Sequence, residues 1–251
     1  MLEGGILMKT ISQMLKPRES VFKDATREDT LNLSDFAEGR IDGKKFFDEN
    51  FKTQGMRTLF ETAFKRFKGE SDTGVIKLTQ AMGGGKTHNM LALALLAQDV
   101  SLRKEVLSTS NYDDIGDIKV ITFSGRENAD YGIWGSIAEQ LGKANVFSKY
   151  YSPLKAPGEK AWINLLQGQN ILILLDELPP YLENAKATTI GNSDLSKVTI
   201  TALANLFSAL GKEQLSNVCL VFSDLKAAYE SGSELLQFTF KELQQEASEP
   251  A

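Results

Sequence analysis

The hydrophobic residues of this chain change their spacing along its length, from a helical period to short apolar runs bounded by polar turns. Between residues 56 and 67 the apolar side chains recur in steps of three and one, as on one face of an α-helix. They are Met56, Leu59, Phe60, Ala63, Phe64 and Phe67. Gly69 follows as a stop signal, because glycine readily adopts the left-handed conformation in which many helices end. The pattern predicts a helix that buries one face.

Beyond this helix, short apolar runs alternate with helical segments. Strands are predicted at residues 75–79, 118–123, 171–175 and 218–222. Helices are predicted at residues 86–98, 131–141, 159–167 and 195–210, with polar loops at 80–85, 108–117, 143–158 and 183–194. The run 171–175 is continuously apolar, which is typical of a strand covered on both faces. We therefore expect an α/β fold in three layers, with a parallel sheet between helices and ligand-binding loops at one sheet edge.

Length and composition fit this architecture. The chain has 251 residues, of which 42% are hydrophobic and 24% charged, as in ordinary globular domains. We interpret residues 1–70 as an N-terminal extension whose helix packs on the core, and residues 71–251 as the core itself. No fifth strand and no helical lid are visible before the end, so we expect a core truncated before its last strand and lid.

Charge and rare residues exclude several classes of function. The net charge of −5 gives no domain-wide basic field for nucleic acid or membrane, although 28 Lys and Arg residues leave room for a local basic face. With Cys219 as the single cysteine and His88 as the single histidine, neither an intrachain disulfide nor a His/Cys zinc site can form. No apolar stretch approaches the roughly 20 residues of a membrane span, and the N-terminus does not resemble a signal peptide. We predict a cytoplasmic protein without a membrane partner.

A glycine-rich segment opens the helix predicted at 86–98. Residues 80–87 read Gln-Ala-Met-Gly-Gly-Gly-Lys-Thr, which matches the phosphate-binding pattern G-x-x-x-x-G-K-[ST] except that Gln80 replaces the first glycine. Consecutive glycines let backbone N–H groups curl around one anion, and the following helix adds its positive dipole end. A glycine-rich turn with an incidental Lys-Thr is the alternative. The strand before the segment and the helix after it favour a phosphate loop.

This interpretation predicts the residues that contact ATP. The candidates for nucleotide binding are Met82, Gly83, Gly84, Gly85, Lys86, Thr87 and His88. Lys86 would neutralise the β- and γ-phosphates during catalysis, and the hydroxyl of Thr87 would bind Mg²⁺. For His88, packing or hydrogen bonding behind the loop is the alternative.

The strand at 171–175 ends in two carboxylates, Asp176 and Glu177. A parallel sheet would bring Asp176 to the edge at which the phosphate loop opens, where it would bind Mg²⁺, usually through water. Glu177 would then polarise the attacking water as a general base. A polar turn that merely ends the strand is the alternative, which the presence of both motifs disfavours.

A strand lies between the two motifs in sequence, and the glutamate directly follows the aspartate. Both features resemble the P-loop division with an additional strand and a catalytic glutamate, which includes the AAA+ ATPases and the helicases. There, the strand after the acidic one often ends in a polar residue near the γ-phosphate, so Ser223 is a candidate, with an ordinary turn residue as the alternative. Arg126 is a candidate for stabilising transition-state charge, with a solvent-facing arginine as the alternative. Another subunit of a homo-oligomer is a further source of that arginine.

Longer strings resemble a known family. They are residues 16–22 (Lys-Pro-Arg-Glu-Ser-Val-Phe), 33–36 (Leu-Ser-Asp-Phe), 79–88 (containing Gly-Gly-Gly-Lys-Thr-His) and 175–181 (Leu-Asp-Glu-Leu-Pro-Pro-Tyr). Over most of its length the chain resembles the N-terminal ATPase region of a prokaryotic family of large AAA+-like ATPases that carries a domain-of-unknown-function label. The same family has a glutamine at the position of Gln80.

The resemblance implies more than the motifs do. It implies ATP and Mg²⁺ as ligands of an AAA+-like module within a larger protein. Such proteins are often found beside DNA methyltransferases and helicases in phage-defence clusters. A role in defence against foreign DNA, with DNA or a DNA-modifying protein as partner, is therefore an expectation.

Three functions are compatible with the sequence. The first is an ATPase that drives remodelling or DNA-linked defence, and the second is a nucleotide-dependent switch or scaffold that hydrolyses ATP rarely. The third is a helicase-type translocase, because Asp-Glu-Leu-Pro at 176–179 also fits a D-E-x-x box. A helicase needs a second motor domain, which 251 residues do not hold.

Overall fold

The fold is described from a computed structural model, which covers Thr10 and residues 31–79, 85–109, 111–126, 131–151 and 154–223. The chain divides into two compact units, Met1–Leu31 and Asn32–Ala251, and everything below concerns the second unit. Met82, Gly83 and Gly84 of the predicted phosphate loop lie outside the described residues.

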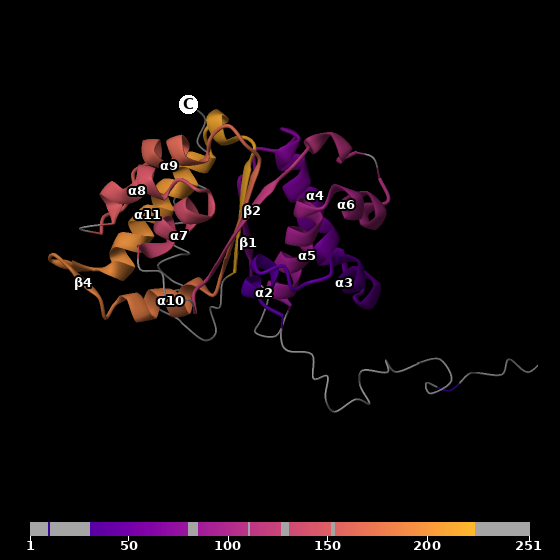
Figure 1. Ribbon diagram of the computed structural model, residues 1–251, viewed down its shortest axis with the longest axis horizontal. Coiled ribbons are helices and arrows are strands. Elements are labelled where there is room, and N and C mark those ends of the chain that lie inside the picture. Colours follow the sequence, from indigo (N-terminus) through magenta and orange to yellow (C-terminus); the bar gives the residue numbers. More distant parts are fainter. Residues whose placement is uncertain are drawn as a thin grey trace, which may run out of the picture. The chain divides into compact units, whose positions relative to one another are not determined.

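Four parallel strands form the central sheet (Figure 1). They are β1 (Val75–Leu78), β2 (Lys119–Ser124), β3 (Ile171–Asp176) and β6 (Val218–Ser223). Each lies within one residue of a predicted strand. Their order in space is β1, β6, β3, β2, so the last described strand is inserted between the first and the third.

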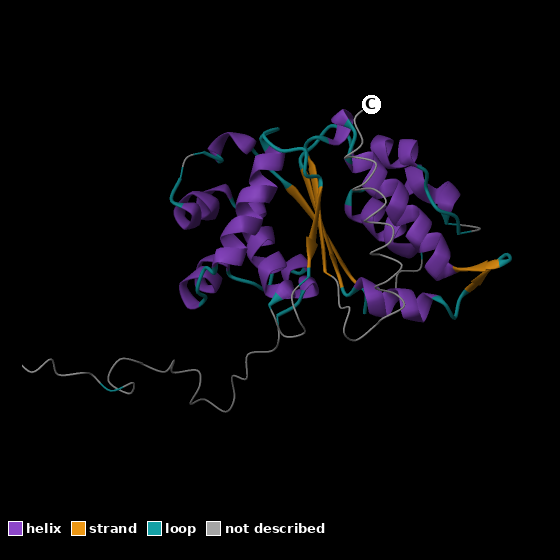
Figure 2. Ribbon diagram, turned by 180° about the vertical axis from the view of Figure 1, so that it is seen from behind, coloured by secondary structure: helices purple, strands orange, loops and turns teal. Residues whose placement is uncertain are grey.

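Helices cover both faces of this sheet (Figure 2). One face carries α2 (Leu33–Ala37), α3 (Gly43–Glu49), α4 (Gln54–Phe67), α5 (Lys86–Gln98) and α6 (Val100–Leu107). The opposite face carries α7 (Gly132–Gln140), α8 (Ala144–Phe147), α9 (Glu159–Leu166), α10 (Leu178–Ala185) and α11 (Leu195–Leu210). The prediction of an α/β fold with a parallel sheet between helices is confirmed.

The strand order explains why the helices divide between the two faces. The chain crosses the sheet in one direction from β1 to β2, and then returns through β3 to β6. Crossovers in parallel sheets share one hand, so a reversal of direction moves the connecting helices to the other face. Accordingly α5 and α6 lie on one side, whereas the helices of the two later connections lie on the other.

Successive side chains of each strand point to opposite faces of the sheet, so a hydrophobic core forms on each face. In β3, Ile171, Ile173 and Leu175 pack toward α7 and α11, whereas Leu172 and Leu174 pack toward α4 and α5. All five side chains are fully buried, as expected for a strand in the middle layer. Cys219 in β6 is buried in the same way, as the sequence predicted, and burial raises the pKa of its thiol to about 12.

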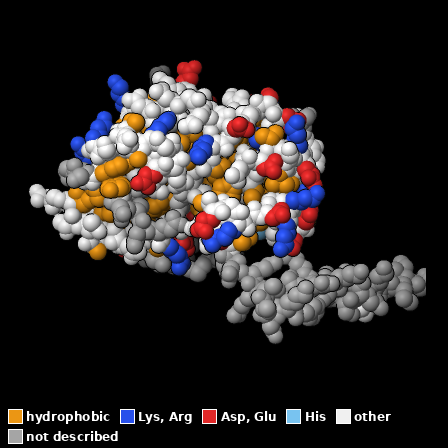
Figure 3. All heavy atoms as spheres, in the orientation of Figure 1, with side chains coloured by type: hydrophobic (Ala, Val, Ile, Leu, Met, Phe, Trp, Pro, Cys, Tyr) orange, Lys and Arg blue, Asp and Glu red, His pale blue; other side chains and the backbone are white. Residues whose placement is uncertain are grey.

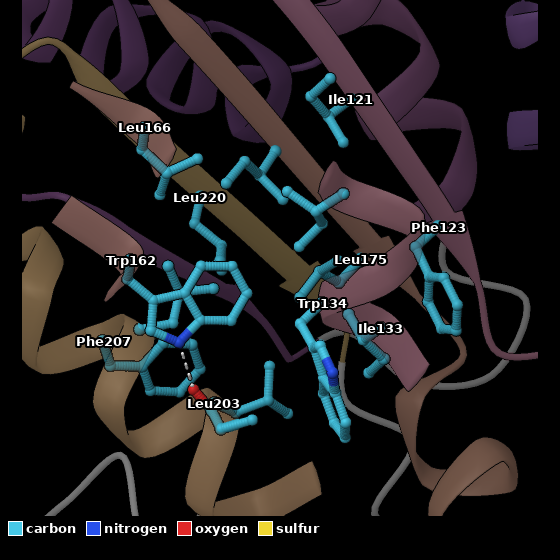
Figure 4. Close-up of a cluster of buried hydrophobic side chains, with 14 of the residues drawn as sticks. Ile121, Phe123, Ile133, Trp134, Trp162, Leu166, Leu175, Leu203, Phe207 and Leu220 are labelled. Carbon is cyan, nitrogen blue, oxygen red and sulfur yellow. Dashed lines mark hydrogen bonds between the residues drawn. The ribbon is translucent and has the colours of Figure 1, made fainter. Parts of the chain in front are cut away.

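Large aromatic side chains fill the core between the sheet and α7, α9 and α11 (Figure 4). The indole of Trp162 is buried, and its Nε1 donates a hydrogen bond to the carbonyl of Ala202 at 3.0 Å. Trp134 and Phe207 pack in the same cluster. Burying a large apolar side chain stabilises the fold by roughly 1.5–3 kcal/mol, so this cluster holds the helices in place behind the strand ends.

The N-terminal helices share the core of the opposite face. The predicted face of α4 is buried, from Met56 to Phe67, and α4 packs on α5 and β6. Gly69 has a φ of +70°, in agreement with its role as a helix stop. The division of the chain at residue 70 stays a prediction.

Several short elements were not predicted from the sequence pattern. Neither α6 nor α10 was predicted, and the loop predicted at 183–194 contains a small hairpin of β4 (Thr189–Ile190) and β5 (Ser193–Asp194). The loop predicted at 143–158 contains α8 and a 3₁₀ turn, Ser148–Tyr150. With eight residues or fewer, these elements are too short to display a clear period.

The described surface carries mixed charge. On the face seen in Figure 3, acidic and basic side chains lie interspersed, which agrees with the small net charge of the sequence. Among the helices of the described residues, none combines the length and the apolar composition that a bilayer crossing requires.

Candidate functional site

The carboxyl ends of the four strands meet at one edge of the sheet. The last residue of β1, Leu78, is in register with Ser223 at the end of β6, and Ser124 at the end of β2 is in register with Asp176 at the end of β3. The loops that follow these strands therefore open on the same edge. In parallel α/β sheets this is the edge at which ligands bind.

The start of α5 lies at this edge, directly after the glycine-rich segment. Gly85 is the N-cap residue with a φ of +74°, a conformation that glycine adopts without strain, and its carbonyl accepts the N–H of Asn89 at 2.9 Å. No side chain among the described residues caps this helix start. The N–H groups of the first helical turn therefore carry the partial positive charge that attracts anions. Lys86, the first residue of the helix, is buried.

The carboxylate of Asp176 connects this helix to β3. The hydroxyl of Thr87 donates a hydrogen bond to Asp176 Oδ2 at 2.5 Å, although the two residues lie far apart in the sequence. The backbone N–H of Glu177 donates to the other oxygen, Oδ1, at 2.9 Å. Asp176 is 5% exposed, and hydrogen bonds to its oxygens offset part of the cost of burying its charge.

Ser223 lies beside this carboxylate at the end of β6 and is fully buried. Its hydroxyl donates to Asp176 Oδ1 and accepts the N–H of Glu177 at 3.1 Å. A hydroxyl has one donor and two lone pairs, so one side chain can serve both neighbours. The described contacts of Ser223 are thus to the acidic pair, and its predicted position near the γ-phosphate stays a prediction.

Glu177 has an unusual backbone conformation. Its φ of +55° and ψ of +35° lie in the left-handed region, which non-glycine residues seldom adopt. Gly125, just after β2, fits against it: a Cβ at Gly125 would lie 1.9 Å from the carbonyl oxygen of Glu177. The N–H of Gly125 also donates to the carbonyl of Asp176 at 2.9 Å. The turn after β3 therefore depends on a glycine after β2.

Arg126 brings a positive charge to the side chain of Glu177. Its Nε lies 2.8 Å from Oε1 and 2.7 Å from Oε2 of that carboxylate. The arginine side chain is 74% exposed and the glutamate side chain 23% exposed. The candidate arginine and the candidate general base are therefore partners in an ion pair at the rim of the site.

The residues after the acidic pair form α10. Pro179 and Pro180 stand in its first turn, where a missing N–H costs nothing and the fixed φ of proline favours the helix. Tyr181 packs edge-on against Phe123 of β2, with ring centroids 5.3 Å apart, and burial raises the pKa of its hydroxyl. The string at 178–181 thus anchors Glu177 from the C-terminal side.

His88 packs against α3. Its ring stacks on Phe46 of α3, with centroids 4.5 Å apart and an interplanar angle of 27°. Burial lowers the pKa of its imidazole. This contact agrees with the packing alternative for His88, and its contact with nucleotide stays a prediction.

The donor set suits a metal that binds together with phosphates. Among the residues that the structure describes, no three His, Cys, Asp or Glu side chains gather as a metal cage. Mg²⁺ in phosphate sites needs no such cage, because it takes one or two carboxylates and completes its shell with water and phosphate oxygens. The oxygens of Thr87 and Asp176, which already lie together, are ligands of that kind.

Together these features define a three-layer α/β domain with a polar site at the carboxyl edge of its parallel sheet. The chain belongs to the DUF499 family: the DUF499 N-terminal domain matches residues 18–127 and 126–246. The first stretch contains Lys86, Thr87 and Arg126, and the second contains the acidic pair and Ser223. The comparison with curated proteins found no match.

Two residues that shape the site were not predicted as such. Gly125 controls the approach of β2 to Glu177, and Phe46 supports His88. The order Ser-Gly-Arg at 124–126, directly after a strand, was a usable signal for the glycine, because a glycine at a strand end often marks close backbone approach. The pairing of Phe46 with His88 joins helices far apart in sequence and leaves no such signal.

Proposed function

We propose that this chain binds ATP at the carboxyl edge of its sheet and hydrolyses it with Mg²⁺. The observation that carries the proposal is the hydrogen bond of 2.5 Å between Thr87 and Asp176. It joins the first turn of the helix after the glycine-rich segment to the end of the acidic strand. Those two motifs were predicted to meet at one metal-bound triphosphate.

The strand order supports the same class of protein. Since β6 lies between β1 and β3, the strand before the glycine-rich segment does not pair directly with the acidic strand. This arrangement is compatible with the additional-strand, catalytic-glutamate division of P-loop proteins, to which the AAA+ ATPases belong. We propose that the chain is an AAA+-like ATPase module of a larger protein.

Each residue has a role in this proposal. The backbone N–H groups of the glycine-rich segment and of the first turn of α5 bind phosphate oxygens, and Lys86 neutralises charge on the β- and γ-phosphates. Thr87 and Asp176 hold Mg²⁺, which would polarise the γ-phosphoryl group when bound. Ser223 keeps the carboxylate of Asp176 and the backbone of Glu177 in a fixed relation.

The reaction proposed is hydrolysis of the terminal phosphoanhydride bond. Glu177 accepts a proton from water while the water oxygen forms a bond to the γ-phosphorus. The bond between the γ-phosphorus and the bridging oxygen breaks, so that ADP leaves with the electron pair. The products are ADP and inorganic phosphate, and the proton passes from Glu177 to solvent.

Two substitutions test binding and chemistry separately. Lys86→Ala should abolish tight ATP binding, because it removes the cationic side chain that neutralises charge on the β- and γ-phosphates in this proposal. Glu177→Gln should keep ATP binding and lower turnover by about a hundredfold or more, because an amide cannot accept the proton. ATP affinity is measured by calorimetry and turnover by phosphate release, with Lys197→Ala as a control, since Lys197 is an exposed lysine on α11.

The outcomes separate the proposals. Unchanged ATP affinity in Lys86→Ala would contradict the phosphate-loop assignment, and normal turnover in Glu177→Gln would remove the role of that residue. A wild-type protein that binds ATP but releases almost no phosphate would favour the nucleotide-dependent switch. The ion pair of Glu177 with Arg126 supports that second candidate, because it occupies the proposed base.

The biological role is a separate proposal. We propose that the ATP cycle serves defence against foreign DNA, through DNA or a DNA-modifying partner, as the family resemblance implies. Phosphate release measured with and without duplex and single-stranded DNA tests this directly. Stimulation of several fold would support a DNA-linked function, and stimulation by single strands alone would favour the translocase alternative.

A further inference from the structure

Residues 140–175 differ in charge from the rest of the chain. They contain one acid, Glu159, and four lysines, which are Lys143, Lys149, Lys155 and Lys160. The whole chain has 28 basic and 33 acidic residues, so 24 basic and 32 acidic residues belong to the remainder. Positive charge is therefore concentrated in one stretch of an acidic chain.

The fold brings three of these lysines together on the surface beside α8 and α9 (Figure 1). The carbonyl of Tyr150 accepts the backbone N–H of Lys155 at 3.2 Å, which places this lysine next to Lys149 along the folded chain. Lys160 follows in the first turn of α9. All three lysines are exposed. We call Lys149, Lys155 and Lys160 the basic surface.

The charges of the basic surface are not neutralised by acids. Among the described residues no carboxylate forms an ion pair with these three lysines, and the Nζ of Lys149 lies over the ring of Tyr150, 5.2 Å from its centroid. The carboxylate of Glu159 is bound elsewhere, because it accepts a hydrogen bond from Ser208 and pairs with Lys212 at 3.8 Å. Many basic side chains elsewhere on the described surface do stand beside acids, namely Arg40, Lys44, Lys65, Lys104, Arg126, Lys186 and Lys197.

The basic surface is poor in apolar anchors. Phe147 of α8 and Trp162 of α9 pack on each other in the core, and each is 1% exposed. In the described part of residues 140–175, Val146 is the one large hydrophobic side chain that is exposed. A protein interface depends on a buried apolar centre, and a helix that binds a bilayer surface needs bulky apolar side chains on one face. A nucleic-acid backbone needs neither, because its phosphates bind through charge.

We propose that the basic surface binds the phosphate backbone of nucleic acid. A lysine offers a compact charge with three rotatable donors, so it can follow phosphates without a fixed geometry. Contacts of this kind position the nucleic acid and do not read its sequence. The proposal gives the DNA partner of the proposed function a place on the molecule, and in that respect it rests on that function. Its lysines are separate from the residues proposed to bind ATP.

Fluorescence anisotropy with a labelled oligonucleotide of about 30 nucleotides, single-stranded and as a duplex, tests this binding without ATP. The triple variant Lys149→Gln, Lys155→Gln, Lys160→Gln should weaken binding about tenfold or more at about 0.1 M salt. The slope of log affinity against log salt should fall by about 2 for the single strand and about 3 for the duplex.

A second triple variant, Lys65→Gln, Lys186→Gln, Lys197→Gln, is the matched control. It removes the same charge from exposed lysines that already pair with acids, whose side chains are 44%, 45% and 72% exposed. Its affinity for the oligonucleotide should stay within about twofold of the wild type. Urea unfolding of both triple variants confirms that they are folded.

The outcomes separate this surface from its alternatives. Equal losses in the two triple variants would overturn the proposal, because they would show an effect of net charge alone. It would also be overturned by a wild-type protein that binds no oligonucleotide at low salt. Loss of binding to phosphatidylserine vesicles with unchanged oligonucleotide binding would point to a membrane instead and overturn it as well. Failure to bind ATP would contradict the proposed ATPase without affecting these measurements, so the two failures are distinguishable.

Discussion

Replacing Gly125 by alanine tests how closely β2 approaches the turn that carries Glu177. A Cβ at this position would lie 1.9 Å from the carbonyl oxygen and 2.7 Å from the carbonyl carbon of Glu177, and 3.0 Å from the Cβ of Tyr181. Two of the three atoms belong to the backbone, so no side-chain rotation relieves the overlap. The strand end and the turn would have to separate by about 1 Å.

The magnitude follows from the contacts that would be lost. Overpacking in a dense interior costs about 1–3 kcal/mol, and separation would break the hydrogen bond from the N–H of Gly125 to the carbonyl of Asp176, which contributes about 1 kcal/mol. The lower entropy of alanine in the unfolded chain returns about 0.4–1 kcal/mol. We therefore expect Gly125→Ala to lower the free energy of unfolding by about 2–3 kcal/mol and the melting temperature by about 5–10 °C.

Urea unfolding, followed by circular dichroism, measures this difference. Gly158→Ala is the control, because a Cβ there meets no atom within 4 Å and φ is −79°. Alanine at this helix N-cap costs about 0.5–1 kcal/mol, and its lower entropy in the unfolded chain returns about as much, so the net change should be a few tenths of a kcal/mol. Gly125→Ala should also lower phosphate release at least tenfold while ATP affinity changes less than threefold, because Gly85 to Thr87 belong to another element. A Gly125→Ala protein as stable as the control would refute the close approach and the argument built on it.

Two further predictions concern residues outside the reacting groups. Arg66→Met should lower the free energy of unfolding by about 3 kcal/mol or more in the same urea assay. The substitution removes the buried guanidinium that donates to the carbonyls of Leu210, Leu215 and Val218, and it leaves these carbonyls unsatisfied. A loss below about 1 kcal/mol would contradict this bridging role. Burial lowers the pKa of His88, so the folded protein binds a proton on this imidazole less readily than the unfolded chain does. The contribution of neutral His88 to the free energy of unfolding is therefore fully present above about pH 6.5, and it is lost as the pH falls through the lower pKa of the folded state. His88→Phe, which keeps an aromatic ring against Phe46, should show a smaller loss of stability between pH 7.5 and 5.5 than the wild type, and an equal loss would show that other groups cause it.

The layered fold followed from the sequence because its signals are local. The strands are short apolar runs bounded by polar residues, and α5 and α11 begin and end at the predicted residues. Their starting residues are also local features: Gly85 allows the left-handed entry to α5, and the side chain of Asp194 accepts the N–H of Lys197 at the start of α11. Strand order is not local, and the sequence alone did not predict that β6 would lie between β1 and β3.

The same distinction applies to the candidate site. Thr87 and Asp176 were predicted to share a ligand, because the loops after parallel strands open on one edge whatever the order of the strands. The partner of Arg126 was not predicted, because it depends on β2 and β3 being neighbours, and Ser124 in register with Asp176 is a property of the folded sheet. Sequence reasoning left a transition-state role or a solvent-facing position for this arginine. Its side chain is 74% exposed and pairs with Glu177, and the transition-state role stays a prediction.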